Sequence, residues 1–122
     1  MHLPLPALAF SEPGAITCIA NDFGYDHVFA RHVEAFGQSG DIWIGLTTSG
    51  NSENIIQAYE VAKHQGLKTI VFLGKDGGKL KGKADIDILV AGETSDRIQE
   101  LHMLILHMMV EGIERCLFPE LY

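Results

Sequence analysis

The sequence predicts an α/β protein with three layers, in which a mostly parallel sheet is flanked by helices. Apolar, strand-like runs alternate with helix-like segments at the spacing of βαβ units. The clearest of these runs, residues 41–46, is apolar at nearly every position, which is typical of a strand covered on both faces. The length of 122 residues predicts one domain, spanning residues 1–122.

The elements are expected in the following chain order. We predict strands over residues 5–10, 41–46, 68–73 and 86–90, and helices over residues 27–36, 52–65 and 95–116. Residues 14–20 are ambiguous and fit a single helical turn, whereas the cluster 21–24 is typical of a turn. The Gly- and Lys-rich residues 75–83 predict a loop with a short helical turn.

Glycines and capping residues set the predicted helix ends. Gly37 and Gly66 follow two of the helices as stop signals. Ser95 or Asp96 is the predicted N-cap of the last helix, which Pro119 ends. That helix is apolar almost all round over residues 101–110, so it needs cover on more than one side. A second copy of the chain is the simplest cover, which predicts a homo-oligomer.

Composition narrows the class of protein. The formal net charge of −7 argues against direct nucleic-acid binding, because an acidic surface repels phosphate backbones. Cys18 and Cys116 share no close-spacing motif and are predicted to be buried thiols in a reducing compartment. Residues 1–10 carry two prolines and no basic residue, unlike a secretory signal, and residues 101–110 are too short and polar to span a membrane. We therefore expect a cytoplasmic protein without a membrane partner.

The strongest chemical signal is Gly45-Leu46-Thr47-Thr48-Ser49-Gly50-Asn51-Ser52, between a predicted strand and a predicted helix. Hydroxyl side chains and unpaired amides at a helix N-terminus form a typical phosphate site. Ligands of open α/β sheets also bind at the carboxyl ends of strands. The alternative is a Ser-rich turn in which Ser52 is a plain N-cap. Neither a Walker A sequence nor a dinucleotide-binding GxGxxG is present.

Four segments together resemble the SIS (sugar isomerase) family, and within it the phosphoheptose isomerases. They are Thr47-Thr48-Ser49-Gly50-Asn51-Ser52, Ala20-Asn21-Asp22-Phe23-Gly24, Gly74-Lys75-Asp76-Gly77-Gly78-Lys79 and Asp96-Arg97-Ile98-Gln99-Glu100-Leu101-His102. Their order and spacing fit along essentially the whole chain. The resemblance implies a Rossmann-like SIS fold, and an enzyme that converts sedoheptulose 7-phosphate to D-glycero-D-manno-heptose 7-phosphate for ADP-heptose and lipopolysaccharide synthesis.

The resemblance also implies roles for individual residues. It implies phosphate or substrate contacts at Thr47, Thr48, Ser49 and Ser52, sugar contacts at Asn21 and Asp22, a substrate and metal contact at Gln99, and a catalytic, metal-binding histidine at His107. Zinc and a homotetramer are implied in the same way. One departure is Thr47, where the family usually has serine, and the hydroxyl is kept.

Taken singly, these residues have plainer interpretations. His107 would be a core histidine, Asp22 a turn residue, Gln99 a surface or capping residue, and the lysines of residues 75–83 part of a solvated loop. His102 has no role implied by the family and is predicted to be structural or at an interface.

The spacing of Gln99 and His107 carries one further hypothesis. Eight residues on one helix separate them by about 12 Å along the axis and about 80° around it. Two side chains so placed do not easily hold one metal ion, so we expect them to serve different copies of a site that forms between subunits.

The family pattern also includes an N-terminal part with a Gly-rich loop and a helix bearing a histidine and a glutamate, for which this sequence has no counterpart. That glutamate is the expected second acid–base group, so we expect a partial SIS domain. Two other functions stay open: a non-catalytic SIS protein that binds the replication initiator DnaA, favoured by the tail Leu117-Phe118-Pro119-Glu120, and a phosphosugar-sensing module.

Overall fold

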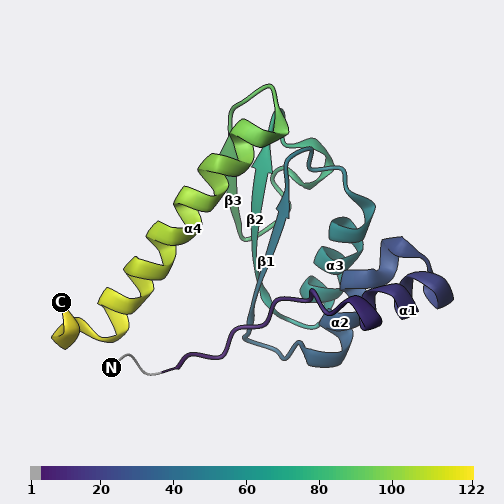
Figure 1. Ribbon diagram of the computed structural model, residues 1–122, viewed down its shortest axis with the longest axis horizontal. Coiled ribbons are helices and arrows are strands. Elements are labelled where there is room, and N and C mark those ends of the chain that lie inside the picture. Colours follow the sequence, from purple (N-terminus) through teal and green to yellow (C-terminus); the bar gives the residue numbers. More distant parts are fainter. Residues whose placement is uncertain (1–3) are drawn as a thin grey trace.

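The structure, a computed structural model, describes residues 4–122. Its centre is a parallel sheet with strand order β1-β2-β3 (Figure 1). The strands are β1 (Ile42–Thr47), β2 (Lys68–Gly74) and β3 (Ile86–Val90), and the helices are α1 (Pro13–Phe23), α2 (Val28–Phe36), α3 (Glu53–His64) and α4 (Ser95–Leu117). Short 3₁₀ turns are η1 (Tyr25–His27), η2 (Gly78–Leu80) and η3 (Pro119–Leu121). The predicted α/β class is confirmed.

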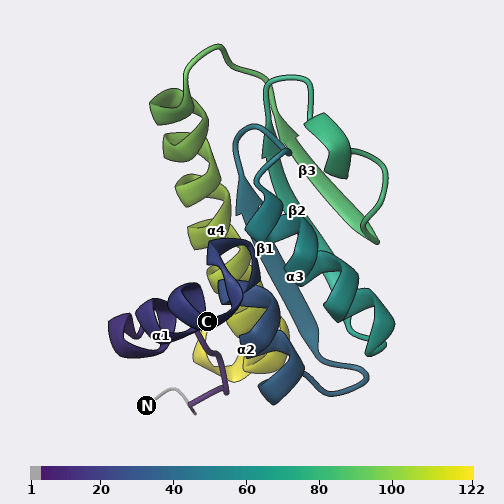
Figure 2. The ribbon, with the colours of Figure 1, turned by 90° about the vertical axis from the view of Figure 1, so that its right-hand side faces the viewer.

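Helices lie on both faces of the sheet, and Figure 2 shows α3 and α4 on opposite sides of it. On the α3 side the core joins Trp43, Tyr59 and Val71, together with Val33 of α2. The Tyr59 hydroxyl donates a hydrogen bond of 2.6 Å to the carbonyl oxygen of Lys83, so this buried ring also keeps its polar end paired. The α3 layer therefore fixes β1 and β2 firmly in place.

The predicted strand over residues 5–10 is wrong. These residues run without regular structure and are mostly exposed. A strand needs a neighbour, and no described strand lies beside this segment. What holds it is Phe10, whose ring stacks on His32 with centroids 4.8 Å apart and lies 6.0 Å from Phe36.

The residues that follow form a helix longer than the single turn expected. Pro13 begins α1, and the Glu12 carboxylate caps it by accepting from the amides of Gly14 (2.9 Å) and Ala15 (2.6 Å). These two hydrogen bonds lower the pKa of Glu12. The predicted turn at residues 21–24 is therefore mostly the last turn of α1, which Gly24 ends with φ of 90°.

The last helix is predicted correctly in extent but not in its cap. Thr94 is the N-cap residue, and Ser95 and Asp96 are the first helical residues. Only Ile98 and His102 of α4 are buried among the described residues. Most apolar side chains farther along α4 are exposed and the others are half-buried, as expected for a helix that needs further cover. Cys18 and Cys116 are exposed as well, so the prediction of buried thiols is wrong.

Within residues 4–122, no helix has the length and apolar character needed to cross a membrane.

Candidate phosphate site

A loop rich in hydroxyl groups, residues 47–52, connects the carboxyl end of β1 to the start of α3; we refer to it as the hydroxyl loop. Thr47 is buried, and its Oγ1 lies 3.0 Å from Ser52 Oγ and 3.5 Å from Ser49 Oγ. The amide of Asn51 donates to Ser49 Oγ at 3.1 Å. The hydroxyls of Thr47, Ser49 and Ser52 thus face one another around one small region.

The first turn of α3 has no side-chain cap. Ser52 occupies the N-cap position, yet its hydroxyl bonds Thr47 rather than an amide of the helix. Ser52 is therefore not a plain N-cap, which was the alternative to a phosphate site. Uncapped amides and the positive end of the helix dipole favour an anion at this point. The carboxylate of Glu53 in the same turn accepts from Gln57 Nε2 at 2.7 Å.

Close contact with the loop after β2 holds the hydroxyl loop in shape. Gly50 has φ of +66°, and a Cβ atom there would collide with the carbonyl group of Gly77. Two hydrogen bonds cross the same contact, from the Leu80 amide to the Gly50 carbonyl (3.2 Å) and from the Lys79 amide to Asn51 Oδ1 (3.0 Å). The predicted Gly- and Lys-rich loop over residues 75–83 therefore supports the hydroxyl loop.

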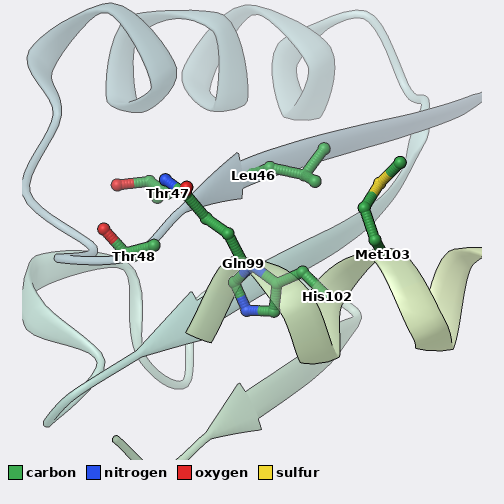
Figure 3. A pocket seen from close by; sticks show the side chains of 6 residues that line it. All are labelled: Leu46, Thr47, Thr48, Gln99, His102 and Met103. Carbon is green, nitrogen blue, oxygen red and sulfur yellow. The ribbon is translucent and has the colours of Figure 1, made fainter. Parts of the chain in front are cut away.

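A pocket of about 300 Å³ lies between the hydroxyl loop and the first turns of α4 (Figure 3). Its lining is Leu46, Thr47, Thr48, Gln99, His102 and Met103. The side chain of Gln99 extends from α4 toward Thr47 across the pocket (Figure 3). The structure thus brings Gln99 to the same place as the hydroxyl loop, from a position 52 residues after Thr47 in the sequence.

His102 lines this pocket, although the sequence indicated only a structural or interface residue. The side chain is 2% exposed, and Nε2 donates to the Leu73 carbonyl oxygen at 2.8 Å. Because that carbonyl can only accept, Nε2 of the ring carries a proton. The ring also meets Phe72 edge-on, with centroids 5.4 Å apart. The signal that could have found it is its spacing of four from Ile98, which places both on the buried face of α4.

The start of α4 is joined to the hydroxyl loop, but its own N-terminus is already occupied. Thr48 Oγ1 lies 3.1 Å from Ser95 Oγ. Hydrogen bonds from the Thr94 hydroxyl and the Arg97 amide lower the pKa of Asp96, which keeps a carboxylate charged at this helix end. Neither helix has a side-chain N-cap, and each carries a carboxylate in its first turn. The carboxylate of Asp96 accepts from an α4 amide, whereas that of Glu53 accepts from the Gln57 side chain.

The remaining predicted site residues lie outside this pocket in a single chain. Asn21 and Asp22 are joined by a hydrogen bond of 2.8 Å and lie near the C-terminal end of α1, which contributes no residue to the pocket lining. His107 is exposed, farther along α4 than Met103, so it is not a core histidine. One copy of the described chain brings Gln99 to Thr47 and Thr48, two of the predicted phosphate contacts, but not to Asn21, Asp22 or His107.

The described residues do not fit a zinc site within one chain. Over residues 4–122, no three side chains of His, Cys, Asp or Glu cluster closely enough to hold a metal ion. Gln99 and His107 are both exposed on α4 and only Gln99 reaches the pocket.

The family model for the SIS domain matches residues 1–74, which is more than half of the sequence. The chain belongs to the SIS domain family.

Curated relatives narrow the similarity within the SIS family. The phosphoheptose isomerase of Fusobacterium nucleatum is 58% identical over 118 residues, which is 97% of this chain and 61% of that protein. That of Vibrio cholerae is 52% identical over 111 residues, or 90% of this chain and 58% of the relative. This SIS chain therefore spans about three fifths of the length of the curated relatives it matches.

Solved structures of phosphoheptose isomerases are also similar to this chain. The phosphoheptose isomerase from Francisella tularensis superposes with a TM-score of 0.89 at 37% identity, over 93% of this chain and 62% of that one. The phosphoheptose isomerase GmhA from Neisseria gonorrhoeae gives a TM-score of 0.83 at 39% identity, over 85% and 58%. The SIS fold of this chain is thus shared with both over the parts that superpose.

Proposed function

We propose that this chain is the phosphosugar-binding portion of a phosphoheptose isomerase, which interconverts sedoheptulose 7-phosphate and D-glycero-D-manno-heptose 7-phosphate. The observation that carries the proposal is the uncapped N-terminus of α3 beneath the hydroxyls of Thr47, Ser49 and Ser52, opposite Gln99. The similarity to phosphoheptose isomerases supports a heptose phosphate as the substrate.

The phosphate group is proposed to lie against the first turn of α3. In the free protein the hydroxyls of Thr47, Ser49 and Ser52 bond one another, and each can rotate to donate to a phosphate oxygen instead. Hydrogen bonds to a charged group are worth about 1.5–3 kcal/mol each. Gln99, which extends over the pocket, then contacts the sugar end of the substrate.

The isomerisation moves a proton between adjacent carbon atoms, and one side chain must remove it and return it. A histidine side chain can take up and return a proton, so His107 suits this role. Because His107 lies outside the pocket that contains Gln99, we propose that it serves the site of a neighbouring copy, and that Asn21 and Asp22 reach the sugar in the same way. A cytoplasmic homotetramer making precursors of lipopolysaccharide is part of this proposal. The proposal also includes a bound zinc ion, and the ligands that one described chain lacks must come from elsewhere.

Binding and turnover of sedoheptulose 7-phosphate test the proposal in one preparation. The affinity is measured by titration calorimetry, and formation of the aldose is followed with Zn²⁺ present. We expect Ser49→Ala and Ser52→Ala each to weaken binding by about 10-fold or more, which corresponds to about 1.4 kcal/mol. Ser11→Ala is the matched control, since Ser11 is exposed and outside the loop, and its affinity should equal that of the wild type.

The outcomes separate the candidate functions. Turnover that His107→Ala abolishes, with binding kept, would support the isomerase and the role of His107. Binding without turnover in any preparation would favour the phosphosugar-sensing module. Affinity that neither serine substitution changes would contradict the phosphate site itself.

A further inference from the structure

The imidazole of His102 has one ring nitrogen that the fold uses and one that it does not. Nε2 donates to the Leu73 carbonyl oxygen at 2.8 Å, which fixes the ring against β2. Nδ1 has no hydrogen-bond partner among residues 4–122. Polar atoms of buried side chains nearly always have a partner, so an unpaired one points to a missing group, such as a ligand.

The unpaired nitrogen is reached from the pocket between the hydroxyl loop and α4. His102 lines this pocket although only 2% of its surface is exposed. Among the described side chains, the polar atoms that are both fully enclosed and unpaired are Gln65 Oε1 and Asp87 Oδ1. Nδ1 of His102 is unpaired but not fully enclosed, so it is open to the pocket. Gln99, which precedes it by three residues on the same helix face, lies beside the ring (Figure 3).

The hydrogen bond to Leu73 determines which chemical group Nδ1 can take. Because Nε2 carries the proton that it donates, Nδ1 of an uncharged ring holds a lone pair and accepts. A hydroxyl group suits this position, since it can donate to Nδ1 and accept from the amide of Gln99 at the same time. A carboxylate or a fully ionised phosphate has no proton to donate to Nδ1. The pocket therefore favours an alcohol group beside His102.

The position of Thr47 indicates which part of a phosphorylated ligand reaches this nitrogen. Thr47 belongs to the hydroxyl loop and also lines the pocket. A ligand whose phosphate lies against the first turn of α3 thus enters the pocket with the carbon atoms nearest the phosphate. The pocket is only about 300 Å³ in volume, so few carbon atoms separate the phosphate from the ring of His102. In open-chain sedoheptulose 7-phosphate, the nearest hydroxyl to the phosphate is the one on C6.

We propose that Nδ1 of His102 accepts a hydrogen bond from the hydroxyl group next to the phosphorylated carbon of the substrate. His102 is then a specificity-determining residue, which selects a phosphorylated polyol over a phosphate ester that lacks this hydroxyl. A buried polar atom left without a partner disfavours the deoxy ligand. The inference rests on the proposed function, because it places the phosphate at α3, and it involves binding only and no transfer of a proton.

Two substitutions separate the roles of the two nitrogens. A glutamine side chain reaches as far as Nε2, so His102→Gln keeps a donor for Leu73 and removes the acceptor from the pocket. An asparagine side chain reaches only as far as Nδ1, so His102→Asn does the reverse. In urea denaturation, His102→Gln should be the more stable variant. The ligand measurements on His102→Gln test the proposal even if His102→Asn fails to fold.

Affinities for sedoheptulose 7-phosphate and for its 6-deoxy analogue are measured by titration calorimetry. We expect the wild type to bind the natural sugar about 10-fold more tightly than the analogue, and His102→Gln to bind the two equally. Combining a change in the ligand with a change in the protein isolates the contact between hydroxyl and Nδ1, as in a double-mutant cycle. His64→Gln, at an exposed position on α3 outside the pocket, is the matched control and should keep the preference.

The nitrogen-15 resonance of Nδ1 in histidine-labelled protein gives a second readout, and it should shift with the natural sugar but not with the analogue. A merely structural role of His102 predicts that His102→Gln weakens both ligands alike or neither, and either result would overturn the inference. So would equal binding of the two ligands to the wild type. If sedoheptulose 7-phosphate does not bind, or binds regardless of Ser49→Ala and Ser52→Ala, the proposed function fails and the inference fails with it. Binding that depends on these serines, with an unchanged preference in His102→Gln, would overturn the inference alone.

Discussion

His102 Nε2 lies 2.8 Å from the carbonyl oxygen of Leu73, and this hydrogen bond fixes α4 to β2 one turn after Gln99. A buried hydrogen bond of this kind sets both the height and the rotation of the helix on the sheet. It therefore determines where Gln99 stands relative to Thr47. The bond connects the fold to the candidate site through a residue that is itself almost inaccessible.

Replacing His102 with leucine should destabilise the chain by about 1–3 kcal/mol, because a buried carbonyl group loses its donor. Urea denaturation measures the change. The matched control is His107→Leu on the same helix, where the side chain is exposed and the change should stay within about 0.5 kcal/mol. Equal effects of the two substitutions would show that the bond to Leu73 contributes nothing.

Gly50→Ala should distort the hydroxyl loop, since φ is +66° and the new methyl group meets the Gly77 carbonyl. We expect a loss of more than about 1 kcal/mol in stability and weaker binding of sedoheptulose 7-phosphate. Gly112→Ala is the control with the opposite expected effect. Gly112 lies in α4 with open space around it, so its replacement by alanine should stabilise the chain by about 0.5–1 kcal/mol. An unaltered phosphosugar affinity in Gly50→Ala would argue against the loop as the binding element.

The stability of the fold should depend on the ionised carboxylate of Asp85. Its Oδ2 accepts from the Thr69 amide (2.8 Å) and hydroxyl (3.0 Å), which lowers the pKa of Asp85. A lowered pKa contributes stability above the unfolded value of about 3.9, and the contribution is lost as the pH falls through the folded pKa. Asp85→Asn should therefore be less stable than the wild type at pH 7, with a difference that shrinks in acid. A double-mutant cycle with Thr69→Val isolates the pair, and a difference that is constant with pH would contradict the assignment.

If Gln99 and His107 serve different copies of the site, inactive variants should complement one another. Gln99→Ala and His107→Ala are each expected to lack isomerase turnover in whatever assembly is active. Mixing them after joint refolding should restore part of it, because some sites then receive both intact residues. Aldose formation is measured in the mixture and in each variant alone. A mixture no more active than its parts would place both residues in the site of one copy.

The sequence was sufficient to predict five elements, because their apolar runs and the glycines that end them reflect local preferences. These elements are β1, β2, β3, α2 and α3. The sequence also located the hydroxyl loop, because the pattern of small polar residues after an apolar run is local too. Residues 5–10 were predicted wrongly as a strand: their composition suits one, but a strand depends on a partner that local sequence does not reveal. The prediction that the thiols of Cys18 and Cys116 are buried was wrong for a similar reason, since burial depends on what packs against α1 and α4.

The part of the site that the sequence could not supply is the meeting of segments distant along the chain. Gln99 and Thr47 line the same pocket because of how α4 crosses the sheet, and the buried side chains of His102 and Ile98 set that crossing. The periodicity of the sequence does not reveal against which face of the sheet a terminal helix packs, or how far along the strands it lies. The placement of Asn21 and His107 relative to the pocket likewise depends on arrangements beyond one helix or one loop.

The uneven anchoring of α4 has a consequence for its motion. Its 23 residues extend about 35 Å, yet its buried side chains, Ile98 and His102, belong to its first two turns, and the rest projects beyond the sheet (Figure 1). Amide exchange in a single chain should therefore be graded, slow near residue 100 and fast toward Leu117, because the distal turns can fray without disturbing the core. The helix would unwind in steps from its far end, and an external contact along that end would convert a fraying segment into a cooperative part of the fold.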